Sequence, residues 1–77
     1  MKTALSVRME LPQNLATALQ KELRERLRLG IQELWYADEF RRIPDGLRAG
    51  AILTAYPALA AQKKTLGALQ AAIKEQA

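Results

Sequence analysis

The sequence contains no cysteine and no histidine, and these absences remove much of the chemistry that a small enzyme could use. Without the two residues there is no thiolate nucleophile, no imidazole base and no usual transition-metal site. Each glycine stands singly, at positions 30, 46, 50 and 67, so the chain has no glycine-rich phosphate loop. We therefore expect neither catalysis, nor a small-molecule substrate, nor a metal or other cofactor.

Long uncharged runs are absent as well. The longest one covers residues 49–62 and contains Pro57, whereas a membrane-spanning helix needs about 20 mostly apolar residues. Arg8 and Glu10 interrupt the one stretch near the N-terminus that could serve as an export signal. Because there is also no cysteine to form a disulfide, the sequence predicts a soluble protein of the cytoplasm.

The chain of 77 residues predicts a single small domain, and a domain of this size buries only about 60% of the surface of its unfolded chain. A protein partner or a second copy is therefore expected to add stability. The net charge is +4, but basic and acidic side chains nearly cancel between residues 21 and 48. This distribution indicates a mixed, solvated surface more than a continuous phosphate-binding stripe.

Residues 3–11 have a period of two that is typical of an extended chain, with Leu5, Val7, Met9 and Leu11 on one side and Ser6, Arg8 and Glu10 on the other. After Pro12 the period becomes helical, and leucine or isoleucine recurs every three or four residues, at positions 15, 19, 23, 27, 31 and 34. Asn14 is a candidate N-cap for this helix. Because no capping residue follows Gly30, we expect one helix to pass through this glycine and end at about Arg42.

The Pro-Asp-Gly sequence at residues 44–46 predicts a turn. A second, alanine-rich helical segment follows, with an apolar residue every seven positions at 52, 59, 66 and 73. Pro57 fits this segment if Thr54 caps a new helix, or else it kinks a continuous one. Gly67 is a candidate for a close approach to the first helical segment.

These patterns predict a mainly α protein, an antiparallel hairpin of two or three helices preceded by an extended arm. The expected order is an arm at residues 1–12, a first helical segment at 13–43, a turn at 44–46 and a second helical segment at 47–77.

Trp35, Tyr36 and Phe40 lie close together near the predicted turn. Aromatic side chains beside arginines are typical of protein-interface centres, although the second helical segment or a second copy would account for them equally well. The predicted partner-binding residues are Leu19, Leu23, Leu27, Leu34, Trp35, Tyr36 and Phe40.

Two stretches, residues 16–34 (ATALQKELRERLRLGIQEL) and 56–73 (YPALAAQKKTLGALQAAI), resemble the helices of the small helical-hairpin co-chaperones of type III secretion needle subunits. In that family a short hairpin packs on a tetratricopeptide-type chaperone, and the pair keeps the needle subunit unpolymerised in the cytoplasm. The resemblance implies a small adaptor or co-chaperone in which Leu19, Leu23, Leu27 and Leu34 face the hairpin or the partner.

A second resemblance carries a different function. Residues 1–19 (MKTALSVRMELPQNLATAL) are similar to the beginning of ribbon-helix-helix repressors and antitoxins, in which two copies pair their strands and read the major groove. The resemblance implies a dimer in which Ala4, Ser6 and Arg8 face the DNA bases. That fold needs a short first helix and a capped second one, and residues 27–35 offer no cap. We therefore favour a protein-interaction module that binds a protein partner or forms a homodimer, with nucleic-acid binding through Ser6 and Arg8 as the alternative.

Overall fold

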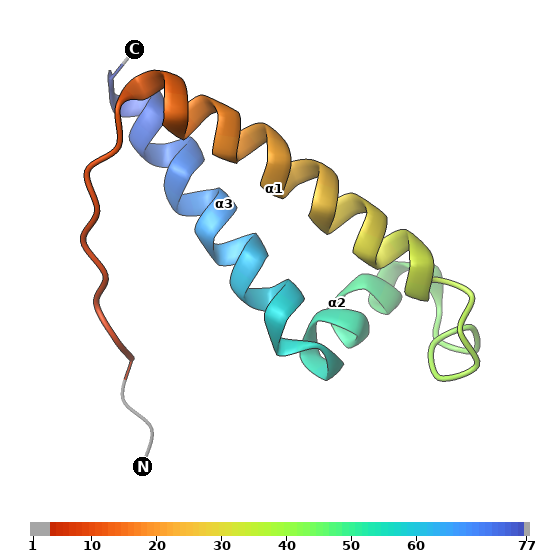
Figure 1. Ribbon diagram of the computed structural model, residues 1–77. Helices are drawn as coiled ribbons and strands as arrows, with labels where there is room; N and C mark the ends of the chain where they lie inside the picture. The colour runs from red at the N-terminus through yellow and green to blue at the C-terminus, as the bar shows by residue number, and fades with distance from the viewer. Residues whose placement is uncertain (1–3, 77) are drawn as a thin grey trace.

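The computed structural model describes residues 4–76, which form three helices and no strand. α1 spans Gln13–Leu34, α2 spans Asp45–Ala55 and α3 spans Pro57–Gln76. α1 and α3 pack along one another in opposite directions, and the short α2 lies at the end of the pair where α1 finishes (Figure 1). The predicted mainly α hairpin is confirmed, as is the absence of helix from the part of the arm that is described; its residues 1–3 lie outside that part.

The arm, residues 4–12, leaves the beginning of α1 beside the end of α3 and diverges from the hairpin (Figure 1). Pro12 has an extended backbone, with φ −54° and ψ 146°, and its carbonyl accepts the N–H of Ala16 at 3.0 Å. The helix therefore begins at Gln13. Asn14, predicted to be the N-cap, lies inside the first turn, so this prediction was wrong.

The contact between α1 and α3 follows a seven-residue repeat on both helices. Its less exposed positions include Ala16, Gln20, Leu23, Leu27, Gly30 and Leu34 on α1 and Leu59, Gln62, Leu66, Leu69 and Ile73 on α3. A helix turns about 100° per residue, so apolar residues spaced by four drift by about 40° at each step. The predicted leucine stripe consequently leaves the contact toward the beginning of α1, where Leu15 is 51% and Leu19 37% exposed.

Gly30 lies inside α1, as predicted, and marks the close approach of the two long helices. A Cβ atom at this position would lie 2.7 Å from a methyl carbon of Leu59. Gly67, which the sequence suggested for this role, has nothing within 4 Å of a Cβ added there, so that prediction was wrong. The close approach of α1 and α3 depends on which glycine faces the other helix, and the residue spacing within one helix does not reveal this.

α1 ends at Leu34, so the predicted boundary at Arg42 was wrong. The chain continues through successive tight turns in which Ala37 N–H donates to the Leu34 carbonyl at 3.1 Å and Phe40 N–H to the Ala37 carbonyl at 2.9 Å. Helix resumes at Asp45, so a loop over residues 35–44 replaces the turn predicted at 44–46. The turns bring Phe40 back into the protein, where it is only 4% exposed.

The break between α2 and α3 falls at Tyr56, whose φ of −122° and ψ of 87° are not helical. Pro57 is the first residue of α3, a position where its missing N–H has no helical partner to lose. Thr54 does not cap this helix, because its hydroxyl donates within α2 to the Gly50 carbonyl at 2.9 Å. Of the two arrangements that the sequence left open, the structure has a new helix beginning at Pro57, although Thr54 does not cap it, and α2 and α3 are separate.

The buried apolar side chains are Phe40, Ile52 and Leu66, one each from the loop, α2 and α3. The Phe40 and Tyr56 rings lie beside one another, with centroids 6.1 Å apart and planes at 55°. Phe40 and Ile52 therefore form a core where the loop and α2 meet, at the end of the hairpin opposite the arm, and Leu66 extends the buried region to the middle of α3.

Candidate protein-binding surface

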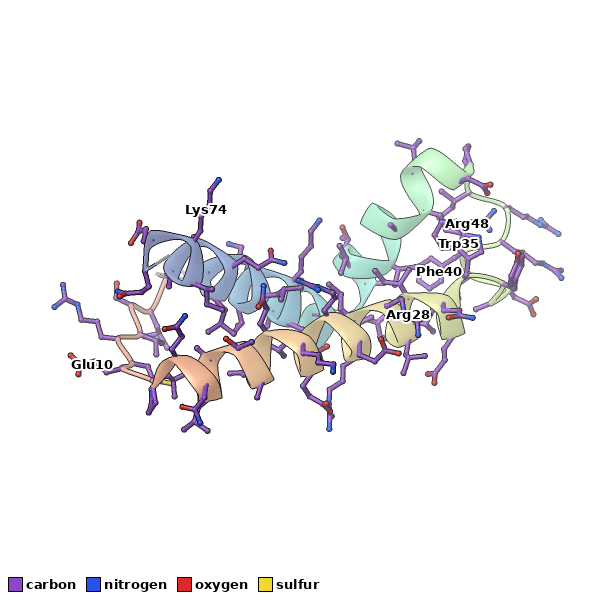
Figure 2. The ribbon with its side chains drawn as sticks, turned by 90° about the horizontal axis from the view of Figure 1, so that it is seen from above. Glu10, Arg28, Trp35, Phe40, Arg48 and Lys74 are labelled. Carbon is purple, nitrogen blue, oxygen red and sulfur yellow. The ribbon has the colours of Figure 1, made fainter. Side chains whose placement is uncertain are left out.

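Arg48 organises the loop end of the hairpin and is only 7% exposed. Its guanidinium donates to three carbonyls of the chain leading into α2, those of Ile43 at 2.8 Å and 3.0 Å, Arg41 at 2.8 Å and Trp35 at 3.2 Å. The same group lies over the Trp35 ring, 4.9 Å from its centroid. Figure 2 shows Arg48, Trp35 and Phe40 gathered at this end of the molecule. These bonds compensate for the burial of a charged side chain.

Sequence reasoning missed Arg48. It counted as one more basic residue on a mixed surface, because its partners lie as far away in the chain as Trp35. The local signal is Asp45, whose carboxylate lies 3.3 Å from the guanidinium one turn earlier in α2. An i,i+3 pair of this kind is common on exposed helix faces, so it does not identify a buried arginine.

The structure does not gather the predicted partner-binding residues on one exposed surface. Leu23, Leu27 and Leu34 are half-buried against α3, Phe40 is buried, and Arg48 covers one face of Trp35. Tyr36 and Leu19 remain accessible. Those two residues lie toward opposite ends of α1, on the order of 20 Å apart along a helix that rises about 1.5 Å per residue.

A larger apolar surface lies at the other end, where the arm meets α1. Its residues, which we call the arm surface, are Leu5, Val7, Met9, Leu15 and Leu19. Leu5 is 90% exposed and Val7 77% exposed. Val7, Met9 and Leu19 line one hollow, and large apolar side chains exposed side by side are typical of interaction sites. Sequence reasoning found the alternation of the arm but placed the binding residues, Leu19 apart, elsewhere.

A groove of about 560 Å³ separates the arm from the helices. The apolar side of the arm forms one wall through Val7, Met9 and Leu11, and Leu19 and Leu69 contribute from α1 and α3. Lys64 supplies a charge at the groove, and small side chains of α3 complete its lining. We call this hollow the arm groove. Its apolar lining suits an apolar occupant more than a polar metabolite.

The outward face of α1 differs from the arm surface, because ion pairs cover it. Arg26 donates to the Glu22 carboxylate at 2.8 Å, and Arg28 bonds Glu25 in the same way. The hydrogen bond from Arg28, together with its charge, lowers the pKa of the Glu25 carboxyl. Exposed pairs of this kind contribute little to stability, and they indicate a face that remains in water.

The residues predicted for DNA contacts, Ser6 and Arg8, lie exposed on the arm. α1 continues through Gly30 to Leu34 as one helix. The short first helix and early second helix that the ribbon-helix-helix resemblance implies are therefore not found within residues 4–76.

The chain matches no protein-family model, and no curated protein or solved structure shows significant similarity to it. Across residues 4–76, no three His, Cys, Asp or Glu side chains cluster in a way that could hold a metal ion. In the same part of the chain, every helix is too short or too polar to cross a membrane. The cytoplasmic location stays a prediction.

Proposed function

We propose that this protein is a non-enzymatic protein-interaction module that binds a protein partner through the arm surface. The exposure of Leu5, Val7, Met9, Leu15 and Leu19 beside an apolar groove carries the proposal. Within residues 4–76, Leu5, Val7 and Met9 are at least 70% exposed, whereas at the loop end Phe40 is buried and Tyr36 and Leu47 are the large apolar side chains left exposed. A surface of this kind is expected to be buried by another molecule.

The free energies of burial and of association favour a binding site made of several neighbouring side chains. Burying a Leu, Val or Met side chain contributes about 1.5–3 kcal/mol, and association costs about 4–15 kcal/mol. One isolated side chain such as Tyr36 at the loop end therefore cannot hold a partner. Buried together, the residues of the arm surface would contribute a free energy of the same order as this cost, which supports this end of the molecule as the binding site.

We extend the proposal to a finer role, for which the same surface is the support. A small adaptor, co-chaperone or inhibitor acts by covering apolar groups of its partner, and an apolar arm beside an apolar groove suits that task. The helical hairpin and the exposed Leu19 agree with what the resemblance to the needle-subunit co-chaperones implies. The co-chaperone role is part of the proposal.

Site-specific photo-cross-linking tests the proposed function. A photoreactive residue at Met9 should yield protein adducts in host extract, whereas the same residue at Leu47 should not. Leu47 is also apolar and exposed but lies on α2, so it is a matched control. Leu19→Asp should abolish the adducts formed from position 9, and Leu47→Asp should leave them intact. Equal adducts from both positions, or nucleic acid alone, would contradict the proposal.

A further inference from the structure

The chain exposes far more surface than a monomer of its mass. Its accessible surface is 6600 Å², whereas a folded monomer of 8.6 kDa is expected to expose about 4700 Å². Its radius of gyration is 14.7 Å, against about 11.5 Å for a compact domain of this length. The excess of about 1900 Å² is more than twice the roughly 800 Å² that each partner buries in a standard interface. The excess surface is therefore more than large enough for a stable interface with a second copy.

The arm presents an unpaired backbone to that second copy. Within the described residues, no backbone N–H or carbonyl of residues 4–11 bonds another backbone group. An extended segment with free donors and acceptors is a template for another strand. A lone two-stranded ribbon is marginally stable, but it becomes stable when an apolar face packs against helices. The arm groove supplies such a face.

The arm is complementary to itself in one antiparallel register. If two arms pair about Met9, Val7 of one lies opposite Leu11 of the other, and Arg8 lies opposite Glu10 on the other face. The apolar residues of both arms then share the face that lines the arm groove. The register places two opposite-charge pairs on the outer face, each favourable across paired strands. Pro12, which has no N–H, ends the pairing.

We propose that the partner of the arm surface is a second copy of this chain. The two arms pair antiparallel about Met9, and the apolar side chains of the resulting ribbon fill the arm grooves of both copies. This inference rests on the proposed function and names its partner. The contact is two-fold symmetric, so every interaction away from the axis is made twice, and the two Met9 side chains meet on the axis.

Sedimentation equilibrium of the full chain and its variants tests the pairing. We expect a dimer between about 1 and 200 μM. Arg8→Glu alone should weaken it by about tenfold or more, because both ion pairs become like-charge pairs. The double variant Arg8→Glu/Glu10→Arg should restore the wild-type Kd, since it reverses both pairs and keeps the net charge. Arg42→Glu, the same charge change on the exposed loop, should leave Kd within about twofold.

Each other outcome overturns the inference. A chain that stays monomeric throughout excludes the second copy, yet the proposed function stands if Met9 still cross-links to another protein. A dimer whose Kd does not change on Arg8→Glu excludes the register. The register is also excluded if the double variant does not return to the wild-type Kd while circular dichroism shows intact helices. The proposed function itself fails if Val7→Asp/Leu19→Asp changes neither self-association nor cross-linking.

Discussion

The two ends of the helical hairpin differ in how far contacts within the chain cover their side chains. At the loop end, Arg48 bonds three carbonyls, its guanidinium covers Trp35, and Phe40 is buried. At the arm end, Leu5 and Val7 extend into solvent beside an open groove. Arg48, Trp35 and Phe40 are held by contacts within the chain, so substitutions of these residues are expected to change folding. The arm end depends on a partner, so substitutions there are expected to change binding.

The largest expected effect separates two aromatic residues of the same loop. Phe40→Ala should lower the free energy of unfolding by about 3–5 kcal/mol, because it removes a buried ring and leaves a cavity. Tyr36→Ala should change it by less than about 0.5 kcal/mol, because Tyr36 is 79% exposed. Urea unfolding followed by circular dichroism measures both. Equal losses would show that the loop end is not packed as described.

A smaller loss is expected from Arg48→Met, which keeps much of the side-chain volume and removes the donors. The carbonyls of Trp35, Arg41 and Ile43 then lose their partner, so the free energy of unfolding should fall by about 3 kcal/mol. Trp35 fluorescence should shift as the ring gains contact with water. Arg41→Met is the control, since this exposed arginine should tolerate the change within about 0.5 kcal/mol. A loss no larger for Arg48 than for Arg41 would remove the contrast between the two ends.

The smallest expected effect concerns the arm. Val7→Ser should change the unfolding free energy of the isolated chain by less than about 0.5 kcal/mol, because the side chain is already in water. Thermal unfolding at a concentration low enough to keep the chain monomeric measures this value. Were the variant to lose as much stability as Arg48→Met, the arm would belong to the core, and its role as a binding surface would be untenable.

Sequence reasoning located the candidate site only in part. It recognised the arm from its alternation and selected Leu19, but it assigned the remaining contacts to the leucine stripe and the loop aromatics. Hydropathy alone does not distinguish Leu19 from Leu23, although one is exposed and the other faces α3. Nor does it distinguish Tyr36 from Phe40, because the turns that bury Phe40 have no strong local signal.

The sequence by itself determined that most of the chain is helical and that it folds as a hairpin, because the 3.6-residue period and the prolines at 12, 44 and 57 act locally. It also determined the extended arm, for the same local reason.

Only the tertiary structure decided where α1 ends, which glycine allows the close approach and which arginine is buried. Each of these depends on residues distant in the chain: Gly30 faces Leu59, and Arg48 bonds the carbonyl of Trp35. Burial is a property of the packed helices together, so the pattern within one segment could not reveal it.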